Sequence, residues 1–561
     1  MRTLGVALAS VALLARPSSA QSRAGDRVDL LLYNGRIVTV DDRFSIASAV
    51  AIRGERIVAV GGDSLLVRLR ADRAIDLRRH VVLPGFDDTH VHVGAVSQRN
   101  LDLSDATSID QITLRIRRRA LMLGRGEWVT GSGWSEDDLA EQRPPSLAEL
   151  DSTAPDNPVL LTRAGDHRAV ANTAAMRLAG ITRATPDPPD GLIEHDSTGA
   201  LTGVFRDGAS EPMRRLIPPP TPEERRESRI ATLRSLLALG ITSVVVASIA
   251  PEEYAEWEAI YRTMRDSLPR ASIQIRPVIG ADGDVRAAVE SLRTFGRVTG
   301  DGDAHLRVGA LEVYLDGGFT GPSAATLVPY RNQPTYSGTL LLTDDALRAL
   351  AAAAHAMRWQ IAFHTVGDAA IAQAVRVLSR VVRESPRADH RHYLDHFSVL
   401  PPDSVLTAMV TARVAVAQQP AFTYTLERRY REYLDSARLA TNNPLRSLTR
   451  RRIPLAFGGD NLPVSPLLGL ATAVTRAGRS GTVYAPAEAL TVREAVTAYT
   501  RTGAWLTREE RLKGTIQPGK LADLIVLSDD PLLAPPAEIA HMRVLMTVLG
   551  GRVAYQREGI R

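Results

Sequence analysis

The sequence contains no cysteine, and this absence excludes two kinds of protein at once. No disulfide framework can form, and no lipid can be attached to a cysteine behind a leader sequence. Aromatic residues make up only 5% of the 561 residues, and no concentrated basic stripe is interleaved with them. We therefore expect no nucleic acid among the partners of this chain.

An apolar run near the N-terminus is too short for an ordinary membrane span. It extends over eleven residues from Leu4 to Leu14, follows Arg2, and precedes small residues that end at Ala20. This order is typical of a secretory signal peptide. We expect cleavage after Ala20, which removes residues 1–20. The mature protein is then expected to be exported, periplasmic or secreted, and not attached to the membrane. An uncleaved anchor is the alternative.

Lysine is nearly missing, since Lys513 and Lys520 are the only two in the chain. Arginine supplies the other positive charges. The formal net charge is +5, and it falls to +3 when Arg2 and Arg16 leave with the signal peptide. Both lysines lie near the C-terminal end, so the sequence offers no lysine that could serve a metal site in its central part.

Two regions of β-type pattern lie at opposite ends of the chain. With 44% hydrophobic residues and this length, the chain is globular and long enough for more than one domain. Runs punctuated by Asn-Gly and Gly read as strands and hairpins near both ends. These runs are residues 28–40, 48–62, 522–531 and 544–555. We predict one split β-sandwich domain, built by residues 21–83 and 513–561.

Short apolar runs alternate with helical patterns through the central part of the chain. The eight strand candidates are residues 81–92, 241–248, 273–280, 306–318, 359–365, 392–400, 412–420 and 453–460. Strands that alternate with helices over this length predict an α/β fold, a TIM-like (β/α)8 barrel, over residues 84–512. Residues from about 104 to 225 do not fit the repeat, and we predict an insertion over the barrel mouth.

The stretch LPGFDDTHVH, residues 83–92, carries two histidines one residue apart. Side chains alternate in a strand, so His90 and His92 are expected on one face, shared with Asp88, where they can bind one ion together. Other polar residues fall late in predicted strands, where such barrels build their active sites. These residues are Glu312, Asp316, His364, His396 and Asp460.

Each of these residues has an alternative role when it is considered alone. His364 and His396 could each be a hydrogen-bonded core histidine, and Asp460 could cap the turn that follows it. The complete set, placed at strand ends, predicts a divalent metal site.

The entry motif Pro-Gly-Phe-x-Asp-x-His-x-His, the single histidines on two later strands, the late aspartate and the split β-domain resemble the amidohydrolase superfamily. The segments GSGW, DHRAVAN, HTVGDAA, AQQP and KGTIQPGKLADLIVLSDDPL resemble the group that contains N-substituted formamide deformylase and related exported metal-dependent hydrolases. The resemblance covers nearly all of the mature chain. It implies that the metal ligands are His90, His92, His364, His396 and Asp460. It also implies substrate contacts for Trp134, His167 and Gln419.

Glu312 departs from the pattern of this superfamily. In much of it a strand lysine, carboxylated on its amine, bridges two metals, and in resembling sequences that lysine stands four residues before an Asp-Gly. Here Glu312 stands four residues before Asp316-Gly317. A glutamate offers the same terminal carboxylate on a shorter arm, so we predict one or two divalent ions per chain, with two favoured and Glu312 as the bridge. The alternative is an acid paired with an arginine beside a single ion.

The chemistry follows from these ligands. A divalent ion, which we expect to be zinc, lowers the pKa of bound water to about 7 and polarises a carbonyl group. Asp460 is expected to take a proton from the attacking water and pass it to a leaving nitrogen. We predict a metal-dependent hydrolase of a non-peptide C–N bond in a small molecule. Val245, Val246 and Trp134 suggest an apolar or aromatic amide.

Two other functions use the same features. One is a deaminase, or an ester or lactone hydrolase, with the same site, since one fold and one ligand set serve several reactions. The other is a non-catalytic exported binding protein with a structural metal, against which the proton-transferring Asp460 argues. Besides the small-molecule substrate, a second copy of the chain in a homo-oligomer stays open as a partner.

Overall fold

Eight parallel strands form the centre of the molecule.

The computed structural model describes residues 26–557 except 94–99, 167, 189–190 and 281–282. The predicted signal peptide therefore lies outside the described residues. Within the described part of the chain, no helix is long and apolar enough to cross a membrane.

The strands of the barrel follow one another in sequence order around a single sheet, from β8 to β21, and β21 also contacts β8. The strands are β8 (Phe86–Val91), β15 (Ile241–Ile249), β16 (Arg270–Ile275), β17 (Leu306–Tyr314), β18 (Ile361–Thr365), β19 (Tyr393–His396), β20 (Ala415–Gln418) and β21 (Leu455–Phe457). Every hydrogen-bonded pair among them is parallel. The predicted TIM-like barrel is confirmed.

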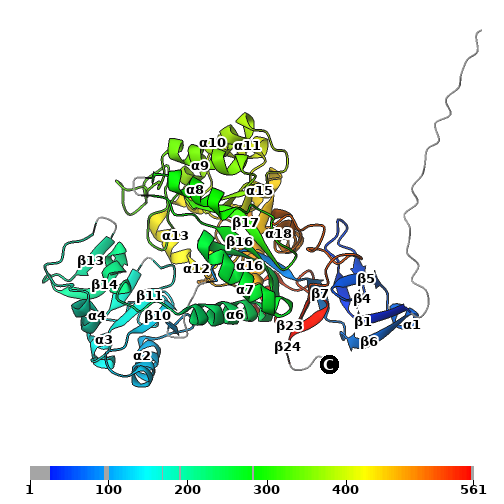
Figure 1. The fold of residues 1–561 in the computed structure, drawn as a ribbon, viewed down its shortest axis with the longest axis horizontal. Coiled ribbons are helices and arrows are strands. Elements are labelled where there is room, and N and C mark those ends of the chain that lie inside the picture. The colour runs from blue at the N-terminus through cyan, green and yellow to red at the C-terminus, as the bar shows by residue number, and fades with distance from the viewer. Residues whose placement is uncertain (1–25, 94–99, 167, 189–190, 281–282, 558–561) are drawn as a thin grey trace, which may run out of the picture.

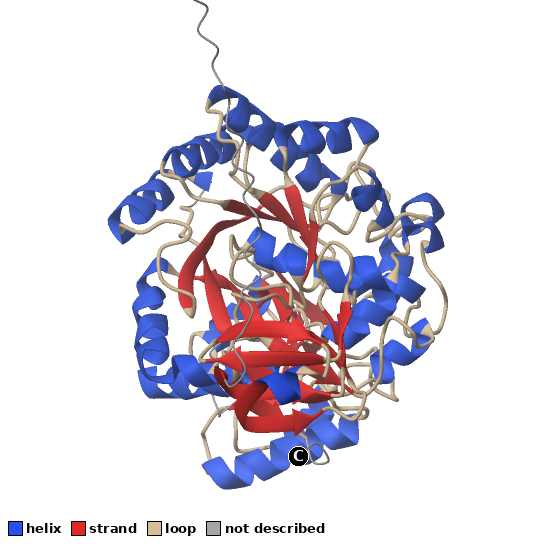
Figure 2. Ribbon diagram, turned by 90° about the vertical axis from the view of Figure 1, so that its right-hand side faces the viewer, coloured by secondary structure: helices blue, strands red, loops and turns tan. Residues whose placement is uncertain are grey.

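Helices cover the outside of this barrel, as Figure 2 shows. They include α6 (Pro222–Ala238), α7 (Tyr254–Met264), α8 (Arg286–Phe295), α9 (Asp344–Ala356), α10 (Asp368–Glu384), α11 (Asp403–Ala412) and α16 (Pro466–Thr475). Helix α6 begins where it does because Thr221 and Glu224 form a capping box around Pro222. The strands are rich in valine and isoleucine because both of their faces are buried, and they form one apolar core with the helices.

Strands from both ends of the chain lie side by side in the second domain. One sheet has the order β5 (Arg56–Gly61), β4 (Ala49–Arg53), β1 (Asp26–Tyr33), β6 (Leu69–Asp76). The other has the order β24 (Arg552–Gln556), β23 (Val544–Leu549), β22 (Leu524–Leu527), β7 (Val81–Pro84), β2 (Arg36–Val38), β3 (Ile46–Ala47). Leu524 pairs with Pro84 and Ile525 with Leu83, so the C-terminal segment completes a sheet begun by the N-terminal one. A shared apolar core joins the two sheets.

The segment between β8 and α6 forms a separate mixed sheet beside the barrel, on the side opposite the β-sandwich (Figure 1). Its order is β13 (Gly191–His195), β14 (Leu201–Asp207), β12 (Arg168–Ala171), β11 (Val159–Arg163), β10 (Val129–Trp134), β9 (Asn100–Asp102), with helices α2 (Ile109–Leu123), α3 (Leu147–Thr153) and α4 (Thr173–Leu178). This insertion has apolar cores of its own. The buried Glu136 accepts hydrogen bonds from Arg163, Arg168 and Arg429, and Arg429 belongs to α13 (Glu427–Tyr433) beside the barrel.

The floor of the barrel holds a buried ammonium group. Lys513 Nζ donates hydrogen bonds to Asp87 Oδ1 at 2.7 Å and lies 2.9 Å from Glu509 Oε2, and it also contacts Ser243. Asp87 and Ser243 lie at the amino ends of β8 and β15, opposite the strand ends that carry the histidines. Lys513 belongs to the C-terminal segment, and it therefore reaches the floor of the barrel and not the strand ends that carry the histidines. Its ammonium is used at the other end, where two carboxylates raise its pKa although burial alone would lower it.

We predict that Lys513→Met lowers the free energy of unfolding by about 3–5 kcal/mol, because it leaves two buried carboxylates without their cation. Urea unfolding measured by circular dichroism checks this value. Lys520→Met is the matched control, since the Lys520 ammonium is half-buried and bonds only a backbone carbonyl, and we expect a loss below about 1 kcal/mol. Equal losses in the two variants would refute the role of the buried network.

Candidate metal centre

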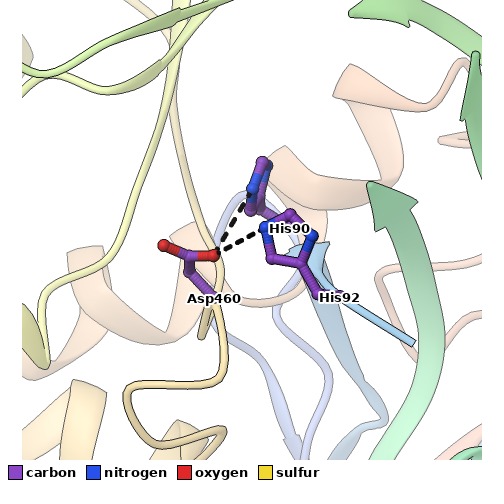
Figure 3. Close-up of side chains that lie close together, drawn as sticks. All are labelled: His90, His92 and Asp460. Atoms are coloured by element: carbon purple, nitrogen blue, oxygen red, sulfur yellow. Dashed lines mark ion pairs between the residues drawn. The ribbon is translucent and has the colours of Figure 1, made fainter. Parts of the chain in front are cut away.

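Three side chains from the first and last strands of the barrel converge on one point. His92 Nε2 lies 3.0 Å from Asp460 Oδ1, and His90 Nε2 lies 3.7 Å from the same oxygen (Figure 3). Asp460 follows β21, and its backbone N–H donates to the carbonyl of His90 at 2.8 Å. The facing strand ends therefore fix both the side chains and the backbone of this cluster.

The donor atoms of the cluster fit a divalent cation. Among the described residues, neither ring nitrogen of the buried His90 has a hydrogen-bond partner, and His364 Nε2 is likewise buried without one. Buried polar atoms are normally hydrogen-bonded, because an unpaired one costs about 1–3 kcal/mol. Imidazole nitrogens and a carboxylate oxygen are also the donors that zinc binds. His90, His92 and Asp460 can hold such an ion together, since their ligand atoms all lie within 4.8 Å of one another.

A second group of ligand atoms shares His90. Glu312 and Asp395 are fully buried, and each has one carboxylate oxygen without a hydrogen-bond partner. Asp395 Oδ1 lies 3.3 Å from His90 Nδ1. Ligand atoms of His90, Glu312 and Asp395, one from each residue, lie within 4.8 Å of one another. The other Glu312 oxygen, Oε2, accepts the backbone N–H of Ser248 at 2.6 Å. Among the described residues Glu312 forms no ion pair with an arginine.

Asp395 was missed in the sequence because it precedes His396 directly. Strand alternation places neighbouring side chains on opposite faces. In the structure His396 has a φ of 74°, a left-handed conformation that is rare outside glycine. The alternation is therefore broken, and both side chains point to the cluster, Asp395 toward His90 and His396 toward Asp460.

His364 and His396 lie next to each other at the ends of β18 and β19. His396 Nε2 and His364 Nδ1 are 2.8 Å apart, and His396 Nδ1 lies 3.8 Å from Asp460 Oδ2. Gln419 is fully buried, and its Oε1 is 2.8 Å from His396 Nδ1, so it orients this ring and is not on the cavity wall. The two histidines adjoin the cluster, yet they are not in either close group of three ligand atoms.

The electrostatics of the cluster favour an ionised Asp460 beside a protonated His92, with His90, His364 and His396 neutral. Burial lowers the pKa of His90, His364 and His396, so these rings are free of a second proton. Burial alone would raise the pKa of Asp460, but the hydrogen bond from His92 and the nearby histidines hold it below its usual range. Burial likewise would lower the pKa of His92, but Asp460 raises it to about 9. The cation that Asp460 attracts is thus a proton on His92 here, and a metal ion would replace it.

A cavity of about 770 Å³ opens above the cluster. His92, His364, His396 and Asp460 lie at its base. Its walls include the apolar and aromatic residues Tyr314, Phe319, Leu341, Phe422, Leu426 and Tyr430, and the insertion contributes Gly165 and Asp166.

The tryptophan and the two valines expected to line the substrate pocket do not form its wall. The Trp134 side chain is not part of the cavity wall, because it is fully buried in the core of the insertion. Val245 and Val246 are buried in the lower and outer parts of the barrel, and at the end of β15 the residue near the site is Ser248, a polar side chain. His167 lies outside the described residues.

A metal-dependent hydrolase is the class that this barrel and this cluster of imidazoles and carboxylates define. A family profile described as "Amidohydrolase family" matches residues 73–555. The chain is 29% identical over 490 residues to the putative amidohydrolase YtcJ of Bacillus subtilis, covering 86% of this chain and 90% of that protein. It is 28% identical over 547 residues to N-substituted formamide deformylase of Arthrobacter pascens, covering 95% and 99%.

The fold has a counterpart among solved structures. An uncharacterized metal-dependent hydrolase from Pyrococcus horikoshii superposes with a TM-score of 0.70 at 23% identity, over 90% of this chain and 99% of that chain. The chain therefore belongs to the amidohydrolase family and is a metal-dependent hydrolase of carbon–nitrogen bonds.

We predict that the double variant His90→Ala/His92→Ala loses the bound metal. Removing a group that only orients a ligand costs about 10–100-fold in metal affinity, so removal of two ligands is expected to weaken binding by more than about 100-fold. Metal content per chain after dialysis, measured by atomic emission, checks this. His195→Ala is the control, since His195 is exposed in the insertion. Full metal occupancy in the double variant would contradict the assignment.

Proposed function

We propose that this enzyme hydrolyses the amide bond of a small substrate with an apolar or aromatic group, and that Asp460 is its general base and acid. The observation that supports this most directly is the Asp460 carboxylate, which lies among three histidines at the base of a cavity. A divalent ion bound there supplies a water of lowered pKa and polarises the carbonyl.

Asp460 is suited to move a proton twice. One of its oxygens faces His90 and His92 and the other faces His396, while the carboxylate also borders the cavity. It accepts the proton of the attacking water and then gives it to the leaving nitrogen, because an amine leaves only when protonated. The hydrogen bond from His92, whose pKa is raised, keeps this carboxylate ionised before the reaction.

The walls of the cavity support a small, partly apolar substrate. A volume of about 770 Å³ is in the range of small-molecule sites, and Phe319, Phe422, Leu426 and Tyr430 give it an aromatic and aliphatic lining. This support comes from the barrel loops and not from Trp134 or Val245. The name of the Arthrobacter relative, which acts on N-substituted formamides, agrees with an amide substrate.

Deamination and ester or lactone hydrolysis are separated from amide hydrolysis by their products. A screen of amides, esters and amino-heterocycles on the metal-loaded enzyme identifies the class. Release of a substituted amine from the amides supports the proposal, whereas ammonia released from the amino-heterocycles alone would assign a deaminase. No turnover with any class, despite tightly held metal, would leave the binding-protein alternative.

We extend the proposal to the number of ions and place Glu312 between two of them. His90, His92 and Asp460 would hold one ion, and His364 and His396 would serve the second. Among the described residues, Glu312 Oε1 has no hydrogen-bond partner and no arginine pairs with this acid, and one Glu312 oxygen belongs to the ligand group of His90. The zinc identity of the ions is part of the same proposal.

Asp460→Asn is expected to lower kcat by about 10²–10⁴-fold, because an amide cannot accept the proton. Asparagine tolerates the left-handed backbone at this position, where φ is 50°, so the fold is retained. Turnover is measured with metal in excess and metal content determined in parallel. Asp166→Asn is the matched control: this cavity residue also has a positive φ, of 62°, and its exposed carboxylate pairs with Arg214. A kcat of Asp460→Asn near the wild-type value across pH would locate the base elsewhere.

Glu312→Ala is expected to reduce the metal content from two ions per chain to one. The activity of the wild-type enzyme is expected not to change when bicarbonate is added, because no carboxylated lysine is needed. Glu312→Gln tests the charge alone, because the amide oxygen can still accept from Ser248 while it binds a cation poorly. Equilibrium dialysis followed by metal analysis counts the ions. A Glu312→Ala variant that binds two ions with unchanged affinity would exclude Glu312 from the ligands.

A further inference from the structure

A short chain of hydrogen bonds connects Glu312 to the wall of the substrate cavity. Ser248, at the end of β15, lies between Glu312 and Tyr314. Its Oγ is 3.0 Å from Glu312 Oε2 and 2.7 Å from the Tyr314 hydroxyl. Tyr314 is two residues beyond Glu312 in β17, so strand alternation places both side chains on the inner face. The far end of this chain, Tyr314, borders the cavity together with His92, His364 and Asp460.

The direction of these hydrogen bonds follows from the number of protons available. Glu312 Oε2 already accepts the backbone N–H of Ser248 at 2.6 Å, so this oxygen presents lone pairs. The Ser248 hydroxyl therefore donates its single proton to Glu312. It has no second proton for Tyr314, and the proton between Ser248 Oγ and the Tyr314 oxygen must come from the tyrosine. The Tyr314 oxygen consequently offers only lone pairs to any other group.

Two neighbouring side chains hold the Tyr314 ring in place. The His364 ring stacks on it with centroids 4.4 Å apart and an angle of 29° between the planes. The guanidinium of Arg276 lies 5.5 Å from the centroid of the Tyr314 ring. A phenol keeps its proton at neutral pH, so the hydroxyl can donate to Ser248. Neither the ring nor the hydroxyl is free to turn and present a donor.

We infer that the Tyr314 oxygen is a specificity-determining acceptor, which takes a hydrogen bond from the amide N–H of the substrate. This inference rests on the proposed amide hydrolysis and deepens it. A buried acceptor that loses its donor is penalised, so a site built around an N–H discriminates against an analogue that lacks it. The enzyme therefore selects primary and secondary amides over N,N-disubstituted amides and over esters, which carry no proton on the leaving atom.

The test uses pairs of substrates that differ only in this proton. The pairs are N-benzylformamide, N-benzylacetamide and N-benzylbenzamide, each with its N-methyl counterpart. The metal-loaded wild-type enzyme is compared with Tyr314→Phe, which keeps the stacked ring and removes the hydroxyl. Tyr430→Phe is the matched control, because Tyr430 also borders the cavity while its hydroxyl contacts Ser398.

Tyr314→Phe is expected to lower kcat/KM for the secondary amides by about 10-fold, the effect of one lost hydrogen bond, and to leave the N-methyl amides within about 2-fold of wild type. Tyr430→Phe is expected to change both members of a pair equally. Equal losses for both amides in Tyr314→Phe would overturn the inference alone, since the hydroxyl would then only support Ser248 and Glu312. No turnover of any amide by the metal-loaded wild type would overturn the proposed function, and the inference with it.

Discussion

One end of the barrel buries several carboxylates and imidazoles, and their hydrogen bonds to one another do not satisfy all of their polar atoms. His90, Glu312 and Asp395 are fully buried within reach of one another, and each keeps an unpartnered polar atom. Transfer of such groups out of water is costly unless a compensating partner is present. A bound cation is the partner that satisfies imidazole nitrogens and carboxylate oxygens together, which is why we propose a metal centre here and not a structural polar core.

The backbone around this cluster is held in conformations that few residues adopt. Ser248, His396 and Asp460 all have a positive φ, at the ends of three different barrel strands. A non-glycine residue in this conformation costs of order 1–3 kcal/mol of folding free energy, and it is kept only where contacts with the surrounding structure hold it there. Here Ser248 is tied to Glu312, His396 to Gln419 and Asp460 to the backbone of His90. The left-handed turns aim side chains inward that a regular strand would direct elsewhere, so the site is rigid before a substrate arrives.

The two ends of the barrel divide stability from function. At the amino ends of the strands, Lys513 closes the floor with Asp87 and Glu509 and joins the C-terminal segment to the barrel. At the carboxyl ends, the cavity is bordered by the barrel loops and by Gly165 and Asp166 of the insertion. The buried Glu136 links that insertion to Arg429 beside the barrel. The same division is general for this fold, in which loops at the carboxyl ends carry the chemistry.

The sequence by itself determined the barrel, its family and the residues that end its strands. Hydrophobic periodicity is local, and the rule that polar residues at strand ends meet in one place needs no coordinates, so His90, His92, His364, His396 and Asp460 could be selected as one group. Tertiary structure decided what depends on backbone reversals and on contacts between distant segments. Asp395 was not selected, because regular alternation directs the neighbour of His396 to the opposite face, and the positive φ of His396 that breaks the alternation belongs to the tertiary structure. The sequence did not place Lys513 in the barrel, because only the folding of the C-terminal segment against the barrel brings it to the floor. It also did not show that Trp134 is buried, because that burial depends on how the insertion packs on itself.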